Sequence, residues 1–167
     1  MEAAESRIYC IDTSSLVNLH LWRPKRRFVE VWGCIDQLID DDRLVAPIQV
    51  FRELARKDDA LAQWAKSRKS MFKRTSPKLV KRVQEVLRKF PDLIDQDEPA
   101  ESADPYLVAL AIHKQRIERE RLFRRDVVVI TEEKYALGRT RIPRVCEQYG
   151  LKYLTIHQMF LFEDWNF

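Results

Sequence analysis

The stretch VVVITEE, residues 127–133, decides the fold of this 167-residue chain. Its four consecutive β-branched residues are typical of a strand, and because no polar residue alternates with them, we expect both faces of that strand to be buried. The mostly apolar run RIYCI at residues 7–11 stops at the polar cluster DTSS, which suits the start of a helix. Strands buried on both faces indicate a sheet that is covered by helices on each side.

The rest of the chain alternates between short strands and helices. Residues 44–46 form a brief strand pattern, and Pro47 after it suits the first position of a helix. Residues 57–89 are basic and have helical spacing, which predicts a helical hairpin. Further helices are expected on each side of residues 127–130, with a last strand at residues 153–156. This alternation predicts a three-layer α/β/α sandwich around a mainly parallel sheet of four to five strands, with residues 127–130 as the central strand.

The composition is that of one folded domain spanning residues 1–167. With 46% hydrophobic and 34% charged residues, the chain is too apolar for general disorder. It has neither an apolar run of roughly 20 residues nor the pattern of a signal peptide, so we expect no membrane association and a cytoplasmic location. Its three cysteines are widely spaced, so we expect them to be reduced and buried rather than paired or bound to zinc. The isoelectric point near 9.0 is compatible with a polyanionic partner.

Five acidic residues fall next to the expected elements in a way that the other acids do not. Asp12 ends the first strand, Glu53 lies in the helix after the second, Asp104 opens a helix, and Glu132 and Glu133 follow the central strand. In a parallel sheet, such positions meet at the carboxyl edge. Crowded carboxylates repel one another unless a cation offsets their charge, and Mg²⁺ or Mn²⁺ prefers these oxygen ligands. The pattern predicts a divalent-metal site that activates water for phosphodiester cleavage.

Four motifs in order along the chain carry a resemblance to a known family. They are IYCIDTS (8–14), VFREL (50–54), ADPYLVALA (103–111) and VVITEE (128–133). Together they resemble the motifs of the PIN-domain nucleases. The resemblance implies a Mg²⁺- or Mn²⁺-dependent endoribonuclease, and many small bacterial and archaeal members are toxins held inactive by an antitoxin. The family's catalytic and metal-binding acids match Asp12, Glu53, Asp104 and Glu133, with Thr13, Ser14, Thr131 and Glu132 as supporting residues.

The chain departs from that family in two places. The family usually has Asp in the last acidic motif, whereas this chain has Glu132 and Glu133, which leaves open which carboxylate faces the metal. The chain is also longer than the minimal domain, and we assign the surplus to a basic helical insert at about residues 57–90 that suits a substrate or a partner. The expected partners are RNA, with DNA left open, an antitoxin protein, and a second copy of the chain in a homodimer.

Each of these acids also has a purely structural interpretation. Asp12 and Asp104 suit the N-cap of the helix that follows them. Glu53 is flanked by arginines and suits a surface ion pair of little energetic weight. Glu132 and Glu133 suit the start of a helix, where negative charge is favourable. Only the order of the four motifs along the chain favours a catalytic interpretation of these acids over a structural one.

Basic and aromatic side chains have competing interpretations as well. The basic residues of the insert suit phosphate contacts or simply a solvated helical face; they are Arg68, Lys69, Lys73, Arg74, Lys78, Lys81 and Arg82. Three tryptophans fit apolar helical stripes and are expected in the core, namely Trp22, Trp32 and Trp64. Aromatic residues near the C-terminus suit an interface if they are exposed.

Other functions compete with the nuclease. One alternative is phosphoryl transfer on a small substrate. Two absences argue against this function: there is no second Asp two residues after Asp12, and the chain has only three glycines from which to build a phosphate-binding loop. A catalytically inactive PIN-like binding or scaffold module would keep the fold without metal chemistry. Metal binding distinguishes this scaffold from the nuclease.

Overall fold

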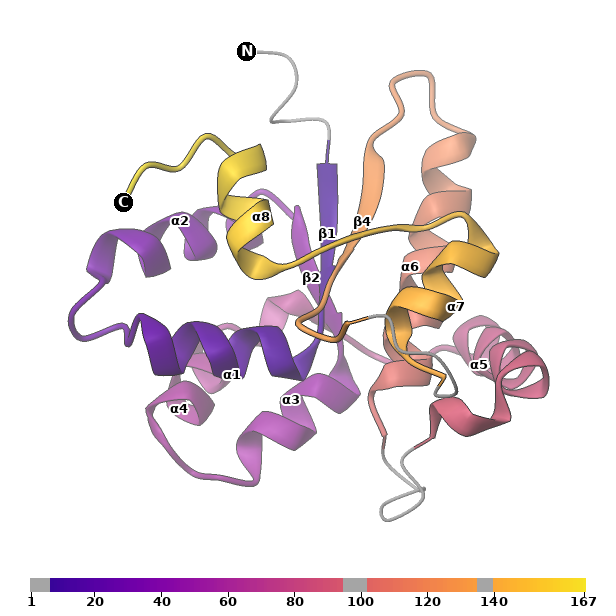
Figure 1. Ribbon diagram of the computed structural model, residues 1–167, viewed down its shortest axis with the longest axis horizontal. Helices are drawn as coiled ribbons and strands as arrows, with labels where there is room; N and C mark the ends of the chain where they lie inside the picture. Colours follow the sequence, from indigo (N-terminus) through magenta and orange to yellow (C-terminus); the bar gives the residue numbers. More distant parts are fainter. Residues whose placement is uncertain (1–6, 95–101, 135–139) are drawn as a thin grey trace.

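The computed structural model describes residues 7–94, 102–134 and 140–167 and has five strands in one sheet (Figure 1). All strand pairs are parallel, and the order across the sheet is β3-β2-β1-β4-β5. The strands are β1 (Arg7–Ile11), β2 (Leu44–Pro47), β3 (Phe72–Lys73), β4 (Asp126–Ile130) and β5 (Lys152–Leu154). The helices are α1 (Thr13–Trp22), α2 (Val29–Asp40), α3 (Ile48–Ala55), α4 (Ala60–Ser67), α5 (Pro77–Lys89), α6 (Asp104–Arg119), α7 (Ile142–Tyr149) and α8 (Ile156–Phe162), with 3-10 turns at Lys69–Met71 and Pro91–Leu93.

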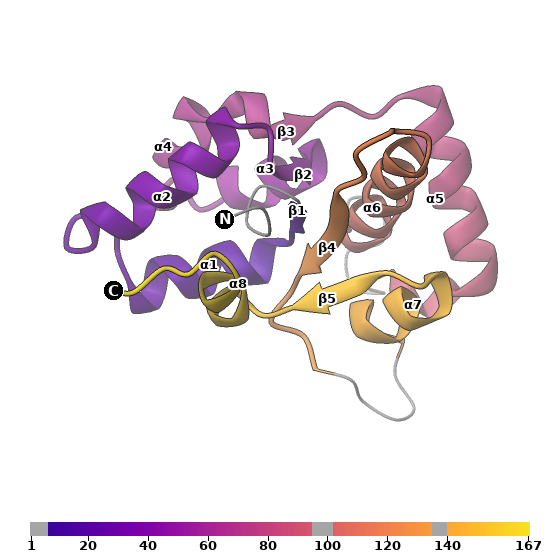
Figure 2. The ribbon, with the colours of Figure 1, turned by 90° about the horizontal axis from the view of Figure 1, so that it is seen from above.

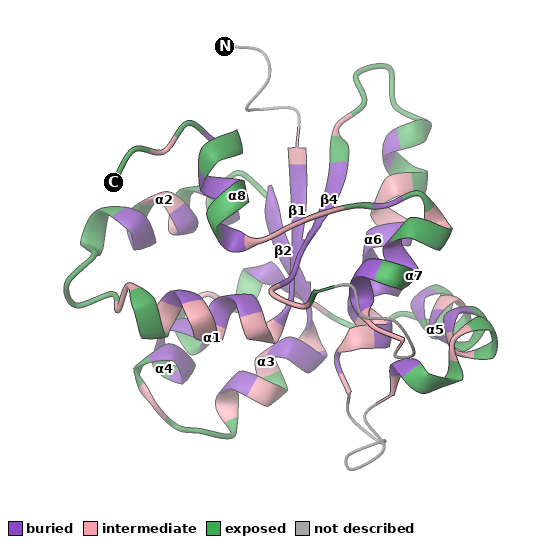
Figure 3. Cartoon of the chain, in the orientation of Figure 1, coloured by how far each residue is buried: buried purple, intermediate pink, exposed green. Residues whose placement is uncertain are grey.

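The sheet separates two hydrophobic cores, which confirms the three-layer α/β/α architecture. Alternate residues of β1 point to opposite faces, so that Tyr9 and Ile11 join one core while Ile8 and Cys10 join the other. The first core is shared with α1–α4 and α8, and the second with α5–α7. Figure 2 shows these two groups of helices on the two sides of the sheet, and Figure 3 shows the buried strands between them.

Residues 127–130 form a strand, as predicted. This strand, β4, is however not the middle strand of the sheet but its neighbour. All four residues are buried, as expected for a strand covered on both faces. The middle strand is β1, which pairs with β2 on one side and β4 on the other.

The predicted helical hairpin at residues 57–89 is wrong, because a strand interrupts it. Phe72 and Lys73 form β3, which pairs with Ala46 and Pro47 at the edge of the sheet. The basic region therefore supplies a strand as well as α4 and α5. Pro47 is the last residue of β2 and the N-cap of α3 rather than its first helical position, and α3 begins at Ile48.

Three smaller expectations need correction. Trp22 is 63% exposed at the end of α1, although Trp32 and Trp64 are buried as predicted. Cys34 is only partly buried, whereas burial raises the pKa of the Cys10 and Cys146 thiols to about 12. The last strand is Lys152–Leu154 rather than residues 153–156, because Thr155 caps α8 with its side chain.

A buried polar cluster fixes the C-terminal segment to the amino edge of the sheet. Glu163 follows α8 and accepts a hydrogen bond from the Tyr9 hydroxyl, with 2.5 Å between the oxygens. The Arg43 guanidinium donates to both oxygens of Glu163, at 2.6 and 3.1 Å. The side chain of Glu163 is thus paired with a cation and a hydroxyl, as a buried carboxylate requires.

Candidate active site

Asp12 lies at the carboxyl end of β1 and caps α1. Its backbone is extended, and its Oδ1 accepts a hydrogen bond from the Ser15 backbone N–H at 2.8 Å, which confirms the N-cap interpretation. The Ser14 hydroxyl lies 2.9 Å from each carboxylate oxygen. The Thr131 hydroxyl, from the end of β4, donates to Oδ2 at 2.5 Å. Asp12 is therefore held by donors from its own helix and from the neighbouring strand.

The Asp12 carboxyl is only 4% exposed, and this burial dominates its electrostatics. Removal from water raises its pKa above the ordinary 3.8, while the hydrogen bonds from Thr131, Ser15 and Ser14 act in the opposite direction. A nearby cation would favour the ionised form of such a group. A buried carboxyl with a raised pKa at the carboxyl edge of a parallel sheet is typical of a functional site.

Glu53, in α3, joins two segments that are far from it in the sequence. The Thr13 hydroxyl donates to Oε2 of Glu53. The Ala103 backbone N–H donates to Oε1, with 3.0 Å between the nitrogen and the oxygen. Because Thr13 follows Asp12 and Ala103 precedes Asp104, these two hydrogen bonds bring three of the predicted acids to one region of the sheet edge.

Asp104 is the first residue of α6 and is partly buried. The expected N-cap role is wrong, because Ala103 occupies the cap position and Pro105 fills the first turn. Asp104 instead adds negative charge to the first turn, where the helix dipole favours it.

Thr131 connects Asp12 to the two glutamates. Besides donating to Asp12, its hydroxyl accepts a hydrogen bond from the Glu133 backbone N–H at 3.1 Å. Oε2 of Glu133 accepts from the backbone N–H of Ile142, the first residue of α7, at 2.9 Å. Oε1 of Glu132 accepts in the same way from Ile156, the first residue of α8, at 2.9 Å. Both glutamates therefore satisfy helix N-termini, but those of α7 and α8, which begin 9 and 24 residues further along, and not of a helix that starts at the glutamates themselves.

The residue types at this edge suit a divalent ion, but their side chains are not arranged around one point. Asp12, Glu53 and Asp104 offer the hard oxygens that Mg²⁺ and Mn²⁺ prefer, and the buried Asp12 would gain from a cation. Within residues 7–94, 102–134 and 140–167, however, no group of three or more His, Cys, Asp or Glu side chains is arranged to hold a metal ion. Asp12 and Glu53 accept hydrogen bonds from protein donors in this arrangement.

Sequence reasoning missed the backbone donors of this region. Ser15 lies three residues after Asp12, and this N-cap spacing is a signal that the sequence contains. No sequence signal marked the backbone donors of Ala103 and Ile142, because a backbone N–H is present whatever the side chain is.

Comparison with known proteins gives a family without an assigned activity. The curated proteins and the solved structures each gave no match to this chain. The family model described as Domain of unknown function (DUF4411) matches residues 9–167, which include all the candidate acids. The chain therefore belongs to the DUF4411 family.

Proposed function

We propose that this chain is a Mg²⁺- or Mn²⁺-dependent endoribonuclease of the PIN-like type. The observation that carries the proposal is the pair of hydrogen bonds to Glu53, from Thr13 beside Asp12 and from Ala103 beside Asp104. Acids from three separate segments thus gather at the carboxyl edge of a parallel sheet, where ligands of such folds bind. The phosphates of RNA supply the further oxygen ligands that these ions need.

The proposed roles follow from the contacts of each side chain. Asp12, Glu53 and Asp104 would hold the ion, and Glu133, whose backbone N–H contacts Thr131, would join them with its carboxylate. When bound, the ion would polarise water and offset the charge of the phosphate. Thr131, Ser14 and the Ser15 N–H orient Asp12, and Thr13 orients Glu53. Glu132 acts as a positioning residue through its contact with α8.

A basic groove between α5 and α6 supports a polyanionic substrate. Its lining includes Lys78, Lys81 and Arg82 from α5 and His113 and Arg116 from α6, around a cavity of about 370 Å³. Burial, together with the neighbouring Lys and Arg charges, lowers the pKa of His113. The groove suits backbone phosphates, which are bound without reading sequence.

Three basic residues of this region already belong to ion pairs, including Arg82 of the groove, which contacts Glu85 at 2.5 Å. Arg68 contacts Asp36 and Asp40 at 2.8 and 3.2 Å, and Lys73 contacts Asp42 at 3.1 Å. The phosphate-binding role is therefore proposed for Lys78 and Lys81 of α5 and not for these three arginine and lysine residues. A toxin role, an antitoxin partner and a homodimer rest on the family resemblance and on expectation alone.

A specific observation favours the inactive scaffold as the second candidate. Oε2 of Glu133 and Oε1 of Glu132 accept hydrogen bonds from helix N-termini, which is what carboxylates with a purely structural role would do. A scaffold would bind its partner without cutting nucleic acid.

Cleavage of a mixed panel tests these alternatives. Purified chain would be incubated with single-stranded RNA, structured RNA or DNA in Mn²⁺, Mg²⁺ or EDTA. The variants Asp12→Asn and Glu53→Gln would be compared with Glu30→Gln, which alters an exposed carboxylate on α2. The nuclease predicts metal-dependent cleavage of RNA that both site variants lose and Glu30→Gln retains. Cleavage of DNA alone would assign a DNA-directed nuclease, and no cleavage of any substrate would favour the scaffold.

A further inference from the structure

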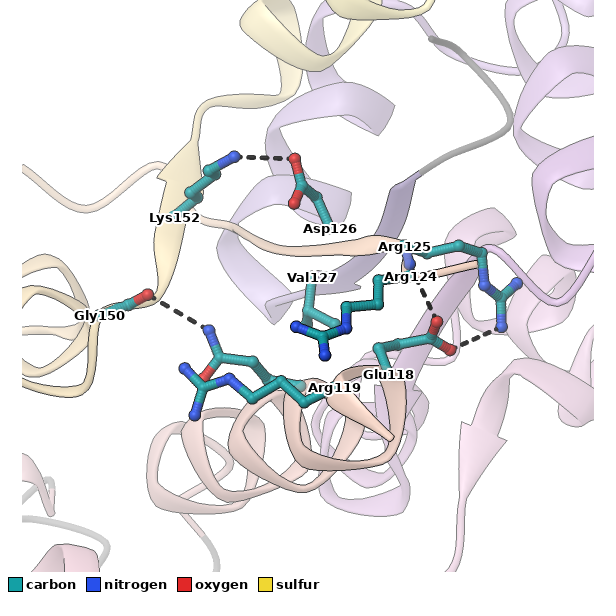
Figure 4. A pocket seen from close by; sticks show the side chains of 9 residues that line it. Glu118, Arg119, Arg124, Arg125, Asp126, Val127, Gly150 and Lys152 are labelled. Carbon is teal, nitrogen blue, oxygen red and sulfur yellow. Dashed lines mark hydrogen bonds and ion pairs between the residues drawn. The ribbon is translucent and has the colours of Figure 1, made fainter. Parts of the chain in front are cut away.

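A second polar pocket lies at the opposite edge of the sheet, where α6 ends and β4 begins. Its wall includes Arg119 from the last turn of α6, Arg124 and Arg125 from the loop, and Lys152 from β5. This edge is at the top of Figure 1, and Figure 4 shows the pocket itself. α6 has 16 residues and is therefore about 24 Å long, at a rise of about 1.5 Å per residue. The pocket is thus separate from the carboxylates at the Asp104 end of the same helix.

The lining of this pocket carries an excess of positive charge. The three arginines and Lys152 face two carboxylates, Glu118 and Asp126, which leaves two positive charges uncompensated. Lys152 contacts Asp126 at 2.8 Å, and Arg125 contacts Glu118 at 3.0 Å. Both carboxylates are therefore already neutralised by neighbours.

The two remaining guanidinium groups belong to Arg119 and Arg124. Neither makes a hydrogen bond or an ion pair with another residue in the described part of the chain. In Figure 4 their side chains lie between the Gly150 wall and the Glu118–Arg125 pair, and no dashed line reaches them. Two unpaired guanidinium groups that share one pocket repel each other, so an anion between them is favourable.

Arg119 and Arg124 are exposed, and contacts of the buried Glu118 hold a residue beside them. Glu118 is 3% exposed, and it accepts hydrogen bonds from both the backbone N–H and the guanidinium of Arg125, each at 3.0 Å. Gln115 donates to the Gly150 carbonyl at 3.3 Å and so joins α6 to the end of α7. The backbone of Arg125, the residue after Arg124, is therefore held in place before any ligand arrives, which lowers the ordering cost of binding.

We infer that this pocket binds a phosphate group through Arg119 and Arg124. A planar guanidinium group can donate two parallel hydrogen bonds to two oxygens of a tetrahedral phosphate. The cavity of about 150 Å³ holds roughly five water volumes, which suits a phosphate but not a whole nucleotide. The group belongs either to a free phosphorylated small molecule or to the terminal phosphate of a nucleic acid. This inference does not depend on the proposed nuclease activity.

Calorimetric titration of inorganic phosphate into the full chain tests the pocket. Ionic strength would be held constant with chloride, so that general screening is the same in every titration. The double variant Arg119→Gln/Arg124→Gln would be compared with Arg26→Gln, which alters an exposed arginine between α1 and α2. We expect saturable binding by the wild type and Arg26→Gln, and affinity at least ten-fold weaker in the double variant. Equal affinity in the double variant, or no binding beyond that of chloride, would overturn the inference.

A second titration distinguishes the two sources of phosphate. Oligonucleotides of one sequence, with either a 5′-phosphate or a 5′-hydroxyl, would be titrated in the Asp12→Asn background to prevent cleavage. Tighter binding of the phosphorylated form that the double variant abolishes supports a nucleic-acid terminus. Equal binding of both forms, with inorganic phosphate still bound, supports a small phosphorylated molecule.

Discussion

The Thr131 hydroxyl donates a hydrogen bond to the Asp12 carboxylate, with 2.5 Å between Oγ1 and Oδ2. This contact joins the carboxyl ends of β4 and β1, which are neighbouring strands, and both residues are buried. Thr131 also accepts a hydrogen bond from the Glu133 backbone. One hydroxyl therefore sets the position of the central carboxylate and of the loop that follows β4.

Replacement of this hydroxyl should destabilise the fold. Thr131→Val keeps the shape of the side chain but removes the donor to Asp12, so we expect a loss of about 1.5–3 kcal/mol, the usual range for a hydrogen bond to a charged group. Urea unfolding at neutral pH measures this change. A free energy of unfolding within about 0.5 kcal/mol of the wild type would show that the hydrogen bond adds no stability.

Asp12 itself should limit stability at neutral pH. Its folded-state pKa is raised above 3.8 by burial, so the stability that the protonated carboxyl contributes is present at low pH and is lost as the pH rises through the folded pKa. Asp12→Asn should therefore melt at a higher temperature than the wild type at pH 7.5. The difference should shrink as the pH falls toward 3.8. A lower melting temperature for Asp12→Asn at pH 7.5 would contradict this assignment of the carboxyl.

Two substitutions of Glu133 separate its structural role from its proposed catalytic role. Glu133→Gln keeps an oxygen that can accept from Ile142, so the free energy of unfolding should stay within about 0.5 kcal/mol of the wild type, whereas Glu133→Ala should lose about 1 kcal/mol. Because Glu133→Gln removes the charge, RNA cleavage should fall. Full cleavage by a stably folded Glu133→Gln would assign Glu133 to the helix cap alone.

Disruption of the buried cluster of Tyr9, Arg43 and Glu163 should lower the stability of the fold strongly. Glu163→Gln removes the negative charge from the buried ion pair with Arg43, and breaking a buried pair in this way costs about 3–5 kcal/mol. Chemical denaturation of Glu163→Gln and of the exposed control Glu30→Gln measures the difference. If both variants unfold like the wild type, the cluster does not hold the C-terminal segment.

The fold was largely predictable because two of its inner strands, β1 and β4, carry a strong local signal. The β-branched run at residues 127–130 and the apolar run at residues 7–11 pair directly in the sheet. In contrast, β3 has only Phe72 and Lys73, and two residues are too few to show a strand period. Trp22 fitted an apolar stripe that ends in solvent, because the period of a helix does not show where its buried face stops.

The proximity of three candidate acids was predictable, but their contacts were not. The order of motifs identified Asp12, Glu53 and Asp104 as neighbours, and the hydrogen bonds of Glu53 agree with that prediction. The capping contacts of Glu132 and Glu133 reach 24 and 9 residues along the chain. Such contacts depend on where α8 and α7 begin in space, which no local pattern specifies.

Binding of Mn²⁺ to the purified chain tests the central claim most directly. Calorimetric titration would compare the wild type, Asp12→Asn and the exposed control Glu30→Gln under the same conditions. The nuclease site predicts saturable binding by the wild type and by Glu30→Gln, with affinity at least ten-fold weaker in Asp12→Asn. Equal Mn²⁺ binding by all three proteins, or no binding by the wild type, would contradict a metal site at Asp12.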